Sequence, residues 1–183
     1  MKKYFFELLF LSLLLAACQK EQKKDPFLIS KTHVGLLTKE VQVRQLDSIF
    51  KEDSVVVKKQ TGMFDPGNEI VVFDQKGTQL LVLEPVQDFD STSTIGNIQV
   101  IDPRFKTQAG FGPNSTFKDI IANYSISRIE ITLDAVVVFI DEINAYVTIK
   151  KTELPMPLQH AENIEPAQIP ETAKINYFWI GWQ

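Results

Sequence analysis

The clearest alternation of hydrophobic and polar residues lies between Asn114 and Pro155. This stretch opens with Asn114-Ser115-Thr116, a typical helix start, and continues with apolar residues at helical spacing: Phe117, Ile120, Ile121 and Tyr124. Two alternating runs and one fully apolar run follow. The order predicts a short helix packed on an antiparallel meander of three strands.

The two alternating runs separate into an apolar face and a polar face. The apolar face carries Ile129, Ile131 and Leu133 from the first run and Ala145, Val147 and Ile149 from the second. The opposite face carries the candidate binding residues Arg128, Glu130, Thr132, Tyr146, Thr148 and Lys150. Because a helix covers only the apolar face, we expect the other face to be open to water or to a partner. Tyrosine and arginine often dominate binding energy; an ordinary solvated sheet face is the alternative.

An earlier stretch, residues 35–84, repeats this order of elements. Its helix is predicted from the spacing of Val43, Leu46, Ile49 and Phe50, and its strands fall at residues 54–58, 70–73 and 80–83. Turns are expected at residues 64–68 and 75–77, where proline and glycine occur. Neither of the last two strands alternates, which predicts burial on both faces.

Aligning the two helix starts indicates an internal duplication. When Thr116 is matched to Gln42, Asp119 and Gln45 both fall at the third helical position, where a side chain can accept a hydrogen bond from the cap. The alternative is that any two αβββ units look alike at this resolution. We therefore predict one α+β domain over residues 27–183, with two αβββ-like units at 27–86 and 97–155.

Residues 156–183 form a separate C-terminal segment. Prolines at 157, 166 and 170 favour an extended connector, and the run from Ile175 to Trp182 predicts a C-terminal strand that is apolar on both faces. Such a strand is expected to dock in the core. The alternative is an exposed aromatic surface for a partner.

The N-terminal residues predict export and a lipid anchor. Met1-Lys2-Lys3 precedes an apolar run, which is typical of a secretory signal peptide over residues 1–17. The sequence Leu15-Ala16-Ala17-Cys18 resembles the lipobox of bacterial lipoproteins, which implies cleavage before Cys18 and lipid on its sulfur and amine. The alternative is an ordinary signal peptide with an incidental cysteine.

Residues 18–26 then form a polar tether. Lys20-Glu21 resembles the surface-export signals of Bacteroidota lipoproteins, although Gln22 stands where a second acid would strengthen the pattern; a plain solvated tether is the alternative. We expect the protein in the bacterial cell envelope, at the outer membrane, with its leaflet undetermined.

Charge and cysteine content narrow the function. Removal of residues 1–17 leaves 17 basic and 22 acidic residues, a net charge of −5, which argues against nucleic acid as a partner. Cys18 is the only cysteine, and His33 and His160 lie far apart, so no metal, cofactor or thiol site is predicted. The acid pairs Asp88/Asp90 and Asp141/Glu142 are interpreted as loop and turn residues rather than a glycosidase pair.

A Gly-led turn, a short helix and a meander resemble small outer-membrane lipoproteins of the BamE (SmpA/OmlA) type and the tandem-repeat β-lactamase inhibitor proteins. This resemblance implies a binding module without catalysis. The sequence departs from it where Lys51-Glu52-Asp53 and Ser125-Ile126 replace the Gly and Pro that follow the family's helix. We therefore expect a non-enzymatic module that binds a protein or an envelope component. The alternative is an envelope hydrolase acting on glycan or peptidoglycan.

Overall fold

The computed structural model describes residues 25–58 and 69–182. The predicted signal peptide, Cys18 and most of the predicted tether lie outside the described residues, as does the turn expected at residues 64–68. Within the described part the protein is α+β, as predicted, with two sheets and few, short helices. No helix in this part is long and apolar enough to cross a membrane.

The main sheet has eight strands in the order β4-β5-β6-β7-β12-β11-β10-β9. Every neighbouring pair is antiparallel. Each half is a meander of four strands, and the last strand of one half, β7, pairs with the last strand of the other, β12. The strands are β4 (Ser54–Lys58), β5 (Glu69–Phe73), β6 (Gln79–Pro85), β7 (Ile95–Val100), β9 (Arg128–Ile131), β10 (Ala135–Ile140), β11 (Ala145–Lys150) and β12 (Tyr177–Gly181).

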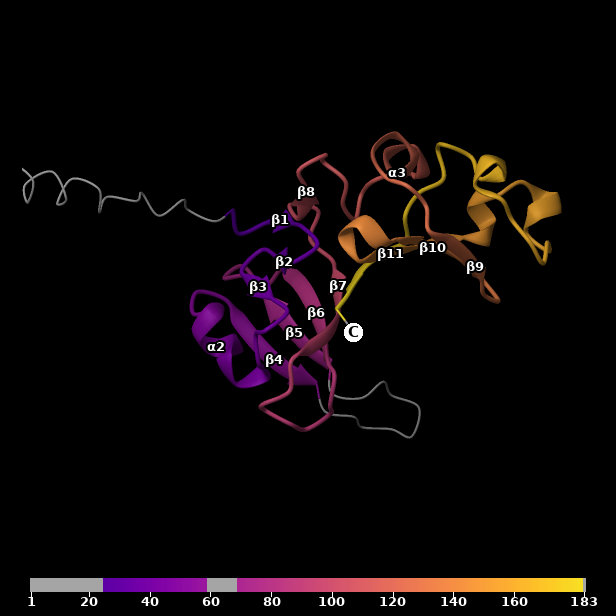
Figure 1. Cartoon of the computed structure of the whole chain (residues 1–183). Coiled ribbons are helices and arrows are strands. Elements are labelled where there is room, and N and C mark those ends of the chain that lie inside the picture. Colours follow the sequence, from indigo (N-terminus) through magenta and orange to yellow (C-terminus); the bar gives the residue numbers. More distant parts are fainter. Residues whose placement is uncertain (1–24, 59–68, 183) are drawn as a thin grey trace, which may run out of the picture.

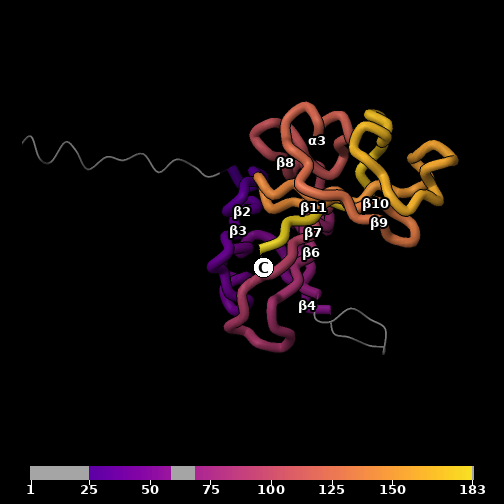
Figure 2. The backbone as a smooth tube through the Cα atoms, turned by 45° about the vertical axis from the view of Figure 1, so that its right-hand side comes forward, coloured from indigo at the N-terminus to yellow at the C-terminus, as the bar shows by residue number. Residues whose placement is uncertain are grey.

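A second sheet, which the sequence pattern did not predict, has four strands of two residues each. Its order is β3-β2-β1-β8, with β1 (Leu28–Ile29), β2 (His33–Val34), β3 (Leu37–Thr38) and β8 (Lys106–Thr107). Strands of two residues carry no periodicity, so the alternation of side chains could not reveal them. In Figures 1 and 2, β2 and β3 lie beside the β4–β7 half, and β8 lies with α3 over the other half.

Both predicted helices are present and begin as expected. The helix α3 (Phe117–Asn123) starts at Thr116, whose N–H donates to Asp119 Oδ2 at 2.7 Å. In the first half a 3₁₀ turn, η2 (Val43–Gln45), leads into α2 (Leu46–Ile49), and the N–H of Gln42 donates to Gln45 Oε1 at 2.8 Å. Further 3₁₀ turns are η3 (Asp141–Ile143), η4 (Lys151–Glu153), η5 (Met156–Leu158) and η6 (Pro166–Gln168).

One hydrophobic core joins the helices to the inner face of the sheet. Phe111 links the two layers, because its ring contacts Tyr124 beyond α3 at 5.5 Å and Phe178 of β12 at 5.0 Å between centroids. In the first half Val71 and Val82, which point away from this core, are buried as well. The predicted burial of β5 and β6 on both faces is therefore confirmed.

Two residues assigned to apolar faces are exposed. Ile121 is 45% exposed, because this helix of seven residues buries Phe117 and Ile120 and leaves the next position on its flank. Leu133 is 96% exposed, because β9 ends at Ile131 and Leu133 lies in the turn to β10. Within β9 and β11 the predicted apolar residues are the more buried ones, as expected, but this alternation does not continue into the β9–β10 turn.

Candidate functional site

The outward face of β9–β12, which we call the open face, carries a row of stacked side chains. Cross-strand pairing aligns Arg128 with Phe139, Phe139 with Tyr146, and Tyr146 with Trp179. The guanidinium carbon of Arg128 lies 3.6 Å from the Phe139 ring centroid. Ring centroids are 5.7 Å apart for Phe139 and Tyr146 and 5.9 Å for Tyr146 and Trp179, with interplanar angles of 28° and 4°. These four residues are the outer row.

The sheet itself produces the outer row. Directly opposite residues of antiparallel strands place their Cβ atoms about 4.5–5.5 Å apart, which brings planar side chains on neighbouring strands into contact. Offset stacking of aromatic rings and an arginine over a ring face are each favourable by about 0.5–1.5 kcal/mol. Four successive strands therefore hold the outer row in one arrangement, with the three rings half-buried and Arg128 exposed.

Tyr146 lies in the middle of the outer row, between Phe139 and Trp179. Burial, with a smaller contribution from the nearby Glu84 carboxylate, raises the pKa of Tyr146 to about 12. Glu84 is held in place by Asn97, whose side-chain N–H donates to its Oε2 at 3.0 Å. The Tyr146 hydroxyl is thus a neutral hydrogen-bonding group at physiological pH, beside a fixed carboxylate and amide.

The predicted binding face is only partly reproduced. Arg128 and Tyr146 belong to the outer row, and Glu130 forms a 2.8 Å ion pair with Arg128. Thr148 is half-buried and accepts a hydrogen bond from the backbone of β12, while Lys150 is exposed at the end of β11. Thr132 is not on a strand, because its hydroxyl closes the β9–β10 turn by hydrogen bonds with Ala135. Thr132 thus lies just beyond the end of β9, and its part in binding, like that of the other five residues, stays a prediction.

Sequence reasoning missed two members of the outer row, Phe139 and Trp179. Phe139 lies in a run that is apolar throughout, so alternation could not assign it to a face. Trp179 belongs to the C-terminal strand, whose position in the sheet was not predicted. That strand docks between β7 and β11, buries Phe178 and Ile180, and leaves Tyr177 and Trp179 outward. The expected docking of this strand in the core is therefore confirmed, and a role of its outward aromatic residues in binding stays a prediction.

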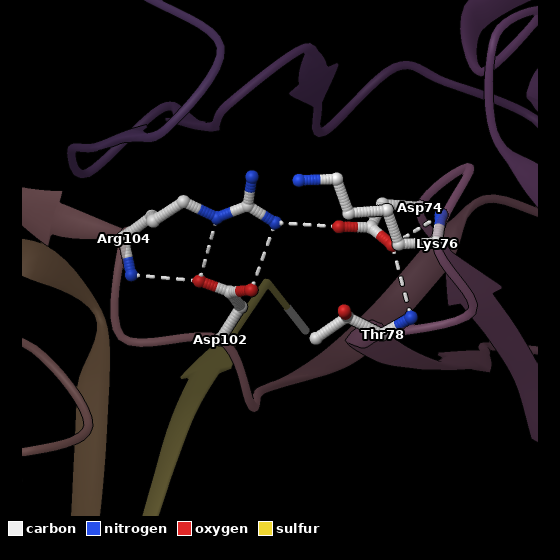
Figure 3. Close-up of polar contacts among 5 residues, drawn as sticks. All are labelled: Asp74, Lys76, Thr78, Asp102 and Arg104. Atoms are coloured by element: carbon white, nitrogen blue, oxygen red, sulfur yellow. Dashed lines mark hydrogen bonds and ion pairs between the residues drawn. The ribbon is translucent and has the colours of Figure 1, made fainter.

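An ion network lies apart from the open face, between the β5–β6 turn and the segment after β7 (Figure 3). Arg104 donates from Nη2 to Asp74 at 3.0 Å and to Asp102 at 2.9 Å. The side-chain hydrogen bonds of Arg104 hold the pKa of Asp102 below its ordinary value. The backbone N–H groups of Thr78 and Lys76, together with Arg104, lower the pKa of Asp74. The charged groups of Asp74, Asp102 and Arg104 are all paired, which is typical of a structural network.

Next to this network, a cavity of about 500 Å³ is lined by Phe27, Phe50 and Asp53, among others. Burial, followed by the neighbouring charges of Asp74 and Glu52, raises the pKa of Asp53. A glycoside hydrolase needs a second carboxylate across its substrate from the first. Asp74 already accepts bonds on both oxygens, and Glu52 is the chain neighbour of Asp53. The cavity does not provide that pair in the expected arrangement.

Comparisons with known proteins identify the fold but not a family. No family model matches this sequence, and a comparison with curated proteins gave no match either. Among solved structures, the uncharacterized protein yfeY from Escherichia coli is similar, with a TM-score of 0.52 and 15% sequence identity. The match covers 84% of this chain and 99% of the yfeY chain. At this identity the similarity concerns the fold alone.

Proposed function

We propose that this chain is a lipid-anchored, non-enzymatic binding module of the bacterial cell envelope, and that a partner protein docks on the open face. The observation that carries this proposal is the outer row. Arginine, tyrosine and tryptophan are the residue types most enriched among binding hot spots. Here they lie together on the outward face of β9–β12, with Arg128 exposed and the rings half-buried.

The stacking of the outer row also favours binding over a purely structural role. A partner loses affinity when flexible side chains must be ordered at the interface, by about 0.5–1.5 kcal/mol for each side chain. The three rings already hold one another, and Arg128 is fixed by Glu130 and Phe139. Docking on this face therefore requires little additional ordering.

The anchor and the location extend this proposal. Lipid on Cys18 would hold the domain at the outer membrane, and residues 19–26 would separate it from the bilayer. In this arrangement the module recruits its partner to the membrane surface.

We also propose that the domain consists of two αβββ-like units that arose by duplication. Three features support this interpretation: the two halves of the sheet have mirrored strand order, each helix precedes its meander, and the hydrogen bond to the cap recurs at Gln45 and Asp119. Each unit gains a fourth strand, β7 or β12, through which the units pair.

The alternative is an envelope hydrolase acting on glycan or peptidoglycan. Its support is the raised pKa of Asp53 beside a cavity. If this alternative holds, the purified protein releases soluble sugar or peptide from peptidoglycan, and Asp53→Asn abolishes the release. If the wild-type protein releases neither product, the hydrolase alternative is excluded.

The test of the binding proposal is a pull-down from the native envelope with the lipidated protein. The variant Arg128→Ala with Tyr146→Ala removes two members of the outer row. The matched control, Lys118→Ala with Ile121→Ala, removes two exposed side chains from α3, on the other side of the sheet. We expect one partner to be captured by the wild type and the control but lost by the first variant, at a temperature at which circular dichroism shows all three proteins to be folded. Equal capture by all three proteins would refute the open face as the docking site.

A further inference from the structure

The strand β9 has a free edge. It is the last strand of the main sheet within the described residues, with β10 on one side. The N–H of Thr132 donates to the carbonyl of Ala135 at 2.9 Å. Antiparallel pairs alternate, so residues 130 and 128 also direct their backbone groups to β10. The N–H and C=O groups of Ile129 and Ile131 consequently point away from the sheet, where another strand can pair with them.

A groove runs along this edge. One wall is β9 with the residues just before it, the other is the segment 162–166, and the volume is about 360 Å³. The second wall is fixed, because Ile164 is buried and the N–H of Glu165 donates to Gln168 Oε1 at 2.8 Å. The edge groove is thus already present and does not have to be opened by a ligand.

The charge of the edge groove favours a cation. Glu162 and Glu165 lie on the second wall, the segment 162–166. The only basic residue of the lining is Arg128, whose guanidinium already pairs with Glu130 at 2.8 Å and rests on the Phe139 ring. The carboxylates of Glu162 and Glu165 form no ion pair with a described residue. The Glu165 carboxylate also accepts the backbone N–H of Gln168 in a capping box, which leaves acceptor positions on both glutamates for lysine or arginine side chains.

The two faces of β9 define the pattern that an added strand must carry. One set of its side chains would lie beside Arg128 and Glu130 on the open face, and the alternate set beside the half-buried Ile129 and Ile131. Four residues of strand span about 13 Å, which sets the length of the paired segment. We propose, on the basis of the proposed function, that the partner contributes an extended segment of alternating basic and apolar residues, which pairs with β9 as an added strand.

The probe is a seven-residue peptide of alternating lysine and valine, acetylated and amidated, titrated into the folded domain. We expect binding that weakens as salt rises, and slower amide hydrogen exchange at Ile129 and Ile131 but not at Glu130, whose N–H is already bonded to β10. Glu162→Gln with Glu165→Gln should raise the Kd about fivefold, while the exposed Glu171→Gln control leaves it unchanged. A peptide with proline in place of the central valine should not bind.

Each result has a definite reading. No binding, equal binding of a glutamate–valine peptide, or binding without protection at Ile129 and Ile131 would overturn strand addition. If the native partner still depends on Arg128 and Tyr146 in the pull-down, the proposed function stands and only the added strand is refuted. If the pull-down fails while the peptide protects both amides, the edge is a binding site and the open face is not.

Discussion

Replacing Asp102 with asparagine measures what the ion network contributes to stability. The Asp102 side chain is only 5% exposed, and its carboxylate accepts three hydrogen bonds from Arg104, at 2.8, 3.0 and 2.9 Å. Asparagine keeps the shape of the side chain, but its amide nitrogen must face one of the Arg104 donors. The substitution therefore removes the negative charge from the remaining hydrogen bonds. It also places the N–H group of the new amide opposite an N–H group of Arg104, where no hydrogen bond can form.

The expected loss is moderate. A hydrogen bond to a charged group contributes about 1.5–3 kcal/mol, but the Arg104 side chain is 47% exposed and water screens part of this interaction. We expect Asp102→Asn to lower the free energy of unfolding by about 1–2 kcal/mol. For a domain of this size, that corresponds to a decrease in Tm of about 2–8 °C.

Thermal unfolding followed by circular dichroism measures this difference, with Glu130→Gln as the matched control. Glu130 also pairs with an arginine at 2.8 Å, but both side chains are more than half exposed, so we expect its Tm to stay within error of the wild type. Because the pKa of Asp102 is lowered in the fold, its contribution is present above the unfolded pKa of about 3.9 and is lost as pH falls through the folded value. Equal Tm for the two variants, or a difference that does not narrow on acidification, would refute this reasoning.

Three further predictions concern the anchor, the core and the open face. Cys18→Ala, expressed behind a cleavable leader, should move the protein from the membrane to the soluble fraction; wild-type protein without lipid mass on Cys18 would contradict the anchor. Phe117→Ala should cost about 3–5 kcal/mol, because the ring is 1% exposed, whereas Ile121→Ala should melt nearly as the wild type does; similar losses would contradict the helix assignment. In an ultraviolet titration, Tyr146→Phe should remove the tyrosine ionisation near pH 12; if this ionisation persists in the variant, it belongs to another tyrosine.

The helices, β9 and β11 could be predicted because their apolar side chains repeat on one buried face, and β5, β6 and β10 because they are short apolar runs. The cap pattern was the most informative signal: Asp119 and Gln45 both accept the expected hydrogen bond from the residue that starts the helix. Strand β12 was also predicted, but its place was not. Nothing local in residues 177–181 indicates that the strand inserts between β7 and β11, since that position depends on contacts distant in sequence.

The candidate site was predicted in part for the same reason. Arg128 and Tyr146 lie in alternating strands, so their faces could be assigned from sequence. Phe139 is hidden in an apolar run, and Trp179 joins the outer row only through the pairing of β11 with β12. The edge groove required the position of residues 162–166, which the prolines around them could mark only as a connector.

The affinity of the captured partner, purified and titrated by calorimetry against the folded domain, tests the central claim most directly. Loss of two hot-spot side chains typically weakens binding by tenfold or more, so we expect Arg128→Ala with Tyr146→Ala to raise the Kd at least about tenfold. The control Lys118→Ala with Ile121→Ala should bind as the wild type does, and circular dichroism should show all three proteins to be folded at the temperature of the titration. Wild-type affinity in the Arg128→Ala with Tyr146→Ala variant would contradict the assignment of the open face as the binding site.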